Sequence, residues 1–191
     1  MQVPLTFYIF VVSMFLWIFP IARQYKSELF FYFLVLGLMD PVMLIVYSII
    51  PDFPIRFFAG LLLLLAVMIC INGKKSLLTF TLFFILFVLI FLLNPLKISP
   101  IIFIIIHFVI IYFFFKRTIM FSAANGKLNL FHIFLLLEEI SIVLKAIFVL
   151  FYNVQAFPSF YITSIFEYFF ALFFSFYRED DERVQIKLGD R

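Results

Sequence analysis

One stretch of the chain decides its fold: Leu130-Phe-His-Ile-Phe-Leu-Leu-Leu-Glu-Glu-Ile-Ser-Ile-Val-Leu-Lys-Ala-Ile-Phe-Val-Leu-Phe-Tyr152. It is long enough to cross a hydrocarbon core, which takes about 20 apolar residues of α-helix. A strand of a transmembrane barrel is about half as long and alternates in polarity. A helix bonds every backbone group within its own segment, so the stretch predicts a membrane-spanning helix.

The composition extends this prediction to the whole chain. Of the 191 residues, 66% are apolar and 13% are charged, and the mean hydropathy is +1.22. A soluble domain has about 25% charged residues, and a disordered chain has low hydrophobicity, so both classes are excluded. Cys70 is the only cysteine, which also excludes a disulfide-stabilised fold. We interpret the 33 phenylalanines as a compositional bias.

Seven stretches meet the length requirement: Val3–Ala22, Leu29–Ile50, Pro54–Ile71, Ser76–Leu93, Ile98–Phe115, Leu130–Tyr152 and Phe157–Tyr177. We expect an all-α polytopic membrane protein, a bundle of seven transmembrane helices over residues 1–177. A short charged tail follows over residues 178–191, either as a solvated helix end or as a docking segment for a partner. Turn and charge signals separate the spans, including a proline-containing turn at residues 94–100 and a loop over residues 116–129.

The basic residues predict the orientation of the bundle. Eleven of them fall on one side if the chain crosses seven times: Arg23, Lys26, Lys74, Lys75, Lys116, Arg117, Lys127, Arg178, Arg183, Lys187 and Arg191. Only Arg56 and Lys97 fall on the other side, and Lys145 lies within a span. Because basic residues favour the cytoplasmic side, we expect the N-terminus outside and the tail inside. Met1 and Gln2 directly precede the first span, so we expect an uncleaved helix in a bacterial inner (plasma) membrane.

Ionisable residues near the middle of the predicted spans are the candidate site, because each is costly to place in hydrocarbon. They are Asp40, His107, Glu138, Glu139, Lys145 and Glu167. His132 and Ser141 are second-tier candidates, because they share polar stripes with these residues on one helix. Four carboxyl groups against one lysine and one histidine predict protonated or paired acids, or a bound cation or proton. The alternative is that these groups only join helices.

Two local features refine this candidate site. Glu138 and Lys145 lie about 10.5 Å apart along a helix axis, so we expect Lys145 to reach a carboxylate on another helix or to extend outward. Asp40 precedes Pro41, which removes a backbone hydrogen bond beside the acid. This arrangement is typical of ion sites in transporters and equally of an ordinary proline kink.

Motifs for enzyme chemistry are not found in the sequence. One cysteine and two distant histidines give no metal-ligand spacing, and there is no phosphate loop or nucleophile elbow. We therefore expect no metal, no cofactor and no assigned catalytic residue. The net charge of +3 is spread along the loops, so we expect no nucleic-acid partner.

Three functional hypotheses remain from the sequence. The first is a non-enzymatic module, either sensor-like or forming a complex with a protein partner or with a second copy in the lipid bilayer. Its seven spans and outside N-terminus resemble the membrane region of bacterial seven-helix sensors in architecture. The second is a small transporter or proton-coupled permease that uses the acidic residues. The third and weakest is an intramembrane enzyme.

Overall fold

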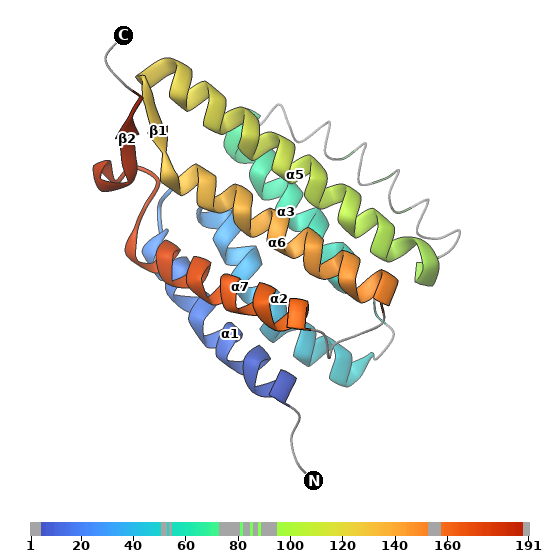
Figure 1. Cartoon of the computed structure of the whole chain (residues 1–191). Coiled ribbons are helices and arrows are strands. Elements are labelled where there is room, and N and C mark those ends of the chain that lie inside the picture. Colours follow the sequence, from blue (N-terminus) through green and yellow to red (C-terminus); the bar gives the residue numbers. More distant parts are fainter. Residues whose placement is uncertain are drawn as a thin grey trace.

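The computed structural model describes residues 5–50, 53, 55–72, 81, 85, 88, 95–152 and 158–188. Within them the chain is helical apart from two short strands, which confirms the predicted all-α class. The long helices are α1 (Leu5–Arg23), α2 (Phe30–Ile49), α3 (Ile55–Asn72), α5 (Pro95–Asn125), α6 (Leu130–Tyr152) and α7 (Pro158–Phe176), as Figure 1 shows. Most of the expected span Ser76–Leu93 lies outside the described residues.

These helices form a closed ring. Each packs against the next described helix in chain order, and α7 returns to pack against α1. Short connections favour packing between consecutive helices, which explains the order. The ring places α2 across from α6, so side chains from distant parts of the sequence meet near its axis.

The helix boundaries follow the predicted spans closely, except in α5. We expected a loop over residues 116–129, but α5 continues to Asn125. That prediction was wrong because Lys116 to Asn125 contains no glycine or proline. The helix stops only at Gly126, whose φ of 61° is the left-handed conformation that glycine adopts easily. Pro95 is the first residue of α5, where its missing N–H leaves no hydrogen bond unmade.

The tail also differs from a simple helix end. After α7 it forms a short 3-10 helix, η2 (Glu182–Val184), and a strand, β2 (Gln185–Lys187). This strand pairs antiparallel with β1 (Lys127–Asn129), with Leu128 opposite Ile186. Val184 is buried in the core, so the tail is folded onto the end of the ring.

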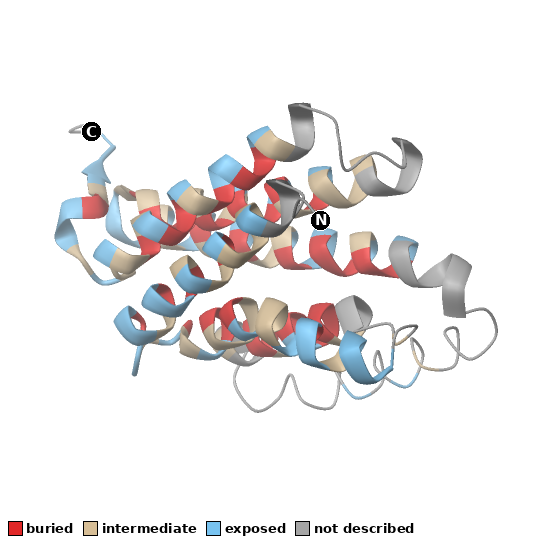
Figure 2. Cartoon of the chain, turned by 90° about the horizontal axis from the view of Figure 1, so that it is seen from below, coloured by how far each residue is buried: buried red, intermediate tan, exposed pale blue. Residues whose placement is uncertain are grey.

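The core lies between the helices, and in Figure 2 the buried residues, in red, lie mainly on the sides of the helices that face one another. Phe33, Phe131 and Phe174 bring α2, α6 and α7 together, with ring centroids 5.0–6.1 Å apart. Such edge-to-face aromatic pairs contribute about 0.5–1.5 kcal/mol each beyond area burial. Some of the phenylalanines are therefore specific packing residues.

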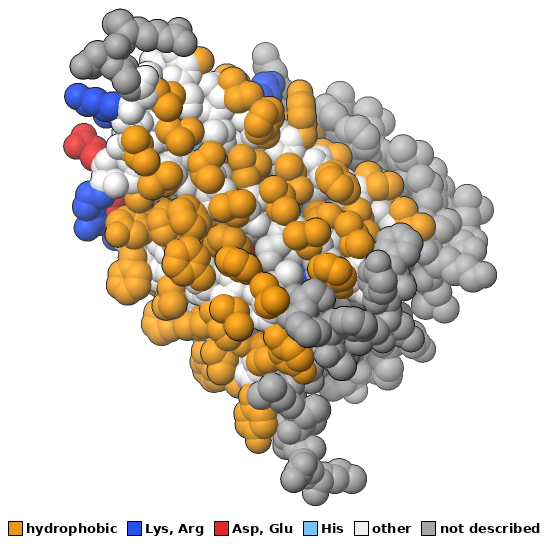
Figure 3. Space-filling view, viewed as in Figure 1, with side chains coloured by type: hydrophobic (Ala, Val, Ile, Leu, Met, Phe, Trp, Pro, Cys, Tyr) orange, Lys and Arg blue, Asp and Glu red, His pale blue; other side chains and the backbone are white. Residues whose placement is uncertain are grey.

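The outer surface is apolar. Among the described residues, two helices, Phe30–Ile49 and Ile101–Asn125, are long and apolar enough to cross a membrane, and three shorter apolar helices accompany them. Hydrophobic side chains are spread over the described part of the face in Figure 3, while charged side chains gather mainly at the end that carries β2. A soluble monomer rarely exposes so large an apolar surface. The seven-span count and the insertion remain predictions.

Candidate functional site

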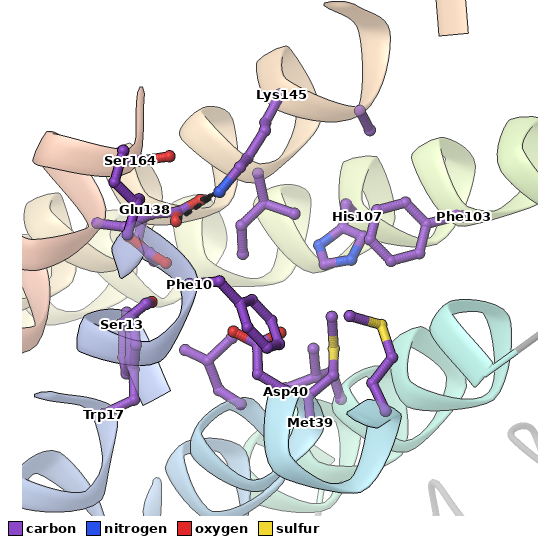
Figure 4. Close-up of a pocket in the computed structure, with 17 residues that line it drawn as sticks. Phe10, Ser13, Trp17, Met39, Asp40, Phe103, His107, Glu138, Lys145 and Ser164 are labelled. Atoms are coloured by element: carbon purple, nitrogen blue, oxygen red, sulfur yellow. Dashed lines mark hydrogen bonds and ion pairs between the residues drawn. The ribbon is translucent and has the colours of Figure 1, made fainter. Parts of the chain in front are cut away.

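A cavity of about 190 Å³ lies inside the ring. All six long described helices contribute to its lining. Helical spacing explains which residues of a helix reach the cavity. On α6, for example, Glu138, Ile142 and Lys145 lie three or four residues apart on one face. Figure 4 shows Asp40, His107 and Lys145 projecting toward the cavity from α2, α5 and α6.

Five of the six candidate residues line this cavity: Asp40, His107, Glu138, Lys145 and Glu167. The sixth, Glu139, lies just outside the lining and bonds to His107. The structure therefore brings all six residues into one connected region. Whether this region is a functional site remains a prediction.

Two buried polar atoms in the lining have no hydrogen-bond partner among the described residues. They are Oε2 of Glu138 and Nε2 of His107. Both side chains are 1% exposed. A buried polar group without a partner is costly, so such atoms are rare unless a ligand or water binds them.

His107 and Tyr32 both bond to Glu139. The hydroxyl of Tyr32 donates to Oε1 of Glu139 at 2.6 Å, and Nδ1 of His107 lies 2.6 Å from Oε2. An ionised carboxylate only accepts, so this network assigns the proton to Nδ1. In the neutral ring Nε2 is then an acceptor. The bond from Tyr32 joins α2 to α6 across the ring.

Lys145 forms an ion pair in the cavity lining. Its Nζ lies 2.9 and 2.7 Å from the two carboxylate oxygens of Glu167 on α7. Of the two alternatives for Lys145, the structure therefore supports a carboxylate on another helix. Asp40 adds a further carboxyl group from α2.

The two second-tier residues lie elsewhere. Ser141 is buried, but it does not line the cavity, and its Oγ has no partner among the described residues. His132 lies at the end of the ring where Arg23, Arg117 and the tail meet, which we call the basic end. Its Nε2 lies there 2.7 Å from Oε1 of Glu179 in the tail. His132 therefore belongs to a separate cluster.

Glu179 is the centre of that second cluster. Its Oε1 also accepts from Nε of Arg117 at 2.7 Å, and Arg117 reaches Glu28 at 2.5 Å. Burial alone would raise the pKa of Glu179, but the bonds and charges of His132 and Arg117 lower it below its ordinary value. Asn129 donates to the Glu179 carbonyl oxygen at 2.9 Å. The cluster fastens the tail to the ends of α5 and α6.

Sequence reasoning missed Tyr32, Gln24 and Glu179. Tyr32 gave no signal, because a tyrosine near a helix end is typical of a membrane interface. Gln24 lies in an expected loop, yet it is buried and donates to the carbonyl oxygens of Phe174 and Tyr177. Glu179 was part of a charged run interpreted as solvated. Only the folding of the tail revealed its partners.

Within the described residues, no group of three or more His, Cys, Asp or Glu side chains is arranged to hold a metal ion. No known family model matches the chain, and neither a curated protein nor a solved structure is significantly similar to it.

Proposed function

We propose that this chain is a multi-pass helical membrane protein that binds a small ligand inside its ring and acts as a non-enzymatic, sensor-like module. In this proposal it spans the inner membrane seven times, with the N-terminus outside and the tail in the cytoplasm. The apolar outer surface supports the location. The basic end supports the orientation, because Arg23, Arg117 and the tail meet there.

The observation that carries the proposal is the pair of unpartnered buried polar atoms, Oε2 of Glu138 and Nε2 of His107. If the polar residues only joined helices, each buried polar atom would be expected to meet a partner on another helix. Glu139 and Glu167 have such partners. Glu138 does not have one at Oε2, and it lines a cavity large enough for a ligand.

The proposal is tested by blocking the cavity. The purified protein is screened in detergent or nanodiscs for small molecules that raise its unfolding temperature, since a ligand that binds only the native state stabilises it. Ala146 lines the cavity, so Ala146→Leu should abolish the stabilisation. Ala123 is exposed on α5, so Ala123→Leu is the matched control and should retain it.

Two results would contradict this function. One is a broad library of cations, anions and neutral compounds in which nothing stabilises the wild-type protein. The other is equal stabilisation of the wild-type protein and the Ala146→Leu variant. A sensor-like or complex-forming module should also contact a protein partner or a second copy that responds to ligand binding. Co-purification of such a partner in a fixed stoichiometry would strengthen the proposal.

A second candidate function is proton-coupled or cation-coupled transport. The observation that favours it is the Lys145–Glu167 pair, because it joins two helices at the cavity and can exchange its partner when a cation or proton binds. In liposomes, Glu167→Gln should then abolish the flux of the transported solute while the protein remains folded. If no solute that binds is transported, the transport function is contradicted and the sensor-like function stands.

A further inference from the structure

We infer that the ligand of the ring cavity is a small organic ammonium cation, with Glu138 as its counter-ion. This inference rests on the proposed function and names the class of ligand for the same site. It follows from the charge of the lining, from the hydrogen-bonding capacity of its unpartnered atoms, and from its size and apolar character.

The charge of the lining favours a cation. Three carboxyl groups line the cavity, those of Asp40, Glu138 and Glu167, against one lysine. Lys145 contacts both oxygens of Glu167, so these two charges offset each other. His107 bonds to Glu139, which lies outside the lining. A cationic ligand would balance the charge of an ionised Glu138, whereas an anion would be repelled by it.

The unpartnered atoms favour a hydrogen-bond donor. A carboxylate oxygen accepts, and Nε2 of His107 accepts when Nδ1 carries the proton toward Glu139. A primary ammonium group has three N–H donors and no acceptor, so it suits either atom. The bond to the carboxylate is charge-assisted, which is the stronger kind. A carboxylate ligand would leave both atoms unpaired.

The size and the remaining lining favour an organic cation over a metal ion. A cavity of roughly 150 Å³ accepts benzene, so about 190 Å³ accommodates a ring or short chain with an amine. Most lining residues are apolar, including Phe10, Trp17, Met39 and Phe103, and they suit a hydrocarbon body. Aromatic faces also attract ammonium groups. In the described part of the chain, no group of three or more His, Cys, Asp or Glu side chains is arranged to hold a metal ion.

The molecule contains a probe for this test. Trp17 is the single tryptophan and it lines the cavity, so its fluorescence reports on occupancy. We would titrate the protein in nanodiscs with cyclohexylammonium, cyclohexanol and cyclohexanecarboxylate, which share a ring and differ in charge. A smaller set, propylammonium and propanol, tests the dependence on size. Ionic strength is kept constant throughout.

We expect an ammonium probe to bind at least tenfold more tightly than its alcohol counterpart, with the carboxylate weakest. Glu138→Gln should reduce the ammonium affinity about ten- to a hundredfold and leave the alcohol affinity unchanged. Glu28→Gln is the matched control, because Glu28 is exposed at the basic end and the substitution removes the same charge. The unfolding temperature of each variant shows that it is folded.

The outcomes separate the two proposals. If the alcohols or the carboxylate bind as tightly as the ammonium probes, or if Glu138→Gln leaves the preference intact, the ammonium inference is overturned while a ligand site remains. If no probe changes Trp17 fluorescence and no library compound stabilises the protein, both proposals fail.

Discussion

At the scale of single residues, two adjacent glutamates of α6 differ in their hydrogen-bond partners. Glu139 is fully buried and accepts from Tyr32 and His107. Glu138 is also buried, but its Oε2 has no partner among the described residues. One residue along a helix turns a side chain by about 100°, so one carboxyl group joins helices and the other borders the cavity. The same substitution therefore has different consequences at the two positions.

Glu139→Gln should lower the free energy of unfolding by about 1–2 kcal/mol, because the amide loses the charged acceptor that serves Tyr32 and His107. Glu138→Gln should change stability little, because Oε2 of Glu138 accepts no hydrogen bond from the described residues. Unfolding of both variants in mixed detergent micelles measures the difference. A larger loss at Glu138 than at Glu139 would contradict the assignment of these roles.

Glu179 provides a test outside the predicted spans. Because the pKa of Glu179 is lowered in the folded state, its contribution to stability is complete above the ordinary glutamate pKa. The contribution is lost as pH falls through the lowered value, when protonation weakens the bonds to His132 and Arg117. We expect the tail to become protease-sensitive in this acidic range.

Glu179→Gln should make the tail protease-sensitive already at neutral pH, with a loss of about 2 kcal/mol in the stability of its docking. Glu182 is exposed three residues further on, so Glu182→Gln makes the same chemical change as a control. Equal protease resistance of the wild-type protein and the Glu179→Gln variant would show that the cluster does not hold the tail.

At the scale of elements, α1 and α2 approach closely at Gly37. A Cβ atom there would lie 2.7 Å from the backbone oxygen of Trp17 and 2.7 Å from a side-chain carbon of Ile21. Small residues let helices approach in this way, particularly in membranes. The backbone oxygen cannot move aside without shifting the helix, so the contact depends on glycine.

Gly37→Ala should therefore separate α1 from α2 and lower the free energy of unfolding by about 1–3 kcal/mol. Gly60 on α3 is the control, since a Cβ there would lie 3.4 Å from Phe103, an ordinary contact. Thermal unfolding of the two variants makes the comparison. If the variants at Gly37 and Gly60 unfold at the same temperature, the close approach of α1 and α2 does not require glycine at position 37.

At the scale of the whole molecule, the closed ring of helices encloses the cavity and brings distant segments of the chain together at its basic end. At the basic end, the connection between α1 and α2, the last part of α5 and the tail meet. Arg117 joins them, because it bonds to Glu28 in the connection and to Glu179 in the tail. These segments are the ones that the alternation of basic residues assigns to the cytoplasm, so their contact is consistent with that orientation.

Cysteine labelling tests the orientation. In a Cys70→Ala background, Ile50→Cys should react with an impermeant maleimide added to intact cells. Tyr25→Cys and Leu188→Cys should react only after permeabilisation, because they belong to the basic end. All three positions are exposed in the structure. Reaction of all three from the same side would contradict the proposed topology.

Much of the helical framework could be predicted from the sequence, because length and apolar runs are local properties. The α6 boundaries agree with the structure, and the six candidate site residues form one region. The extension of α5 and the folding of the tail could not be predicted in the same way. They depend on an uninterrupted helical stretch and on strand pairing between Leu128 and Ile186, which are far apart in the chain.

The sequence by itself determined the helical class, the membrane-length segments and which ionisable residues lie within them. These follow from backbone hydrogen bonds made inside each segment and from the cost of charge in an apolar setting. Only the tertiary structure decided which of those residues pair and which face the cavity. The rotation of each helix is set by contacts across the ring, such as that between Tyr32 and Glu139, 107 residues apart. No periodicity within one helix encodes such a contact.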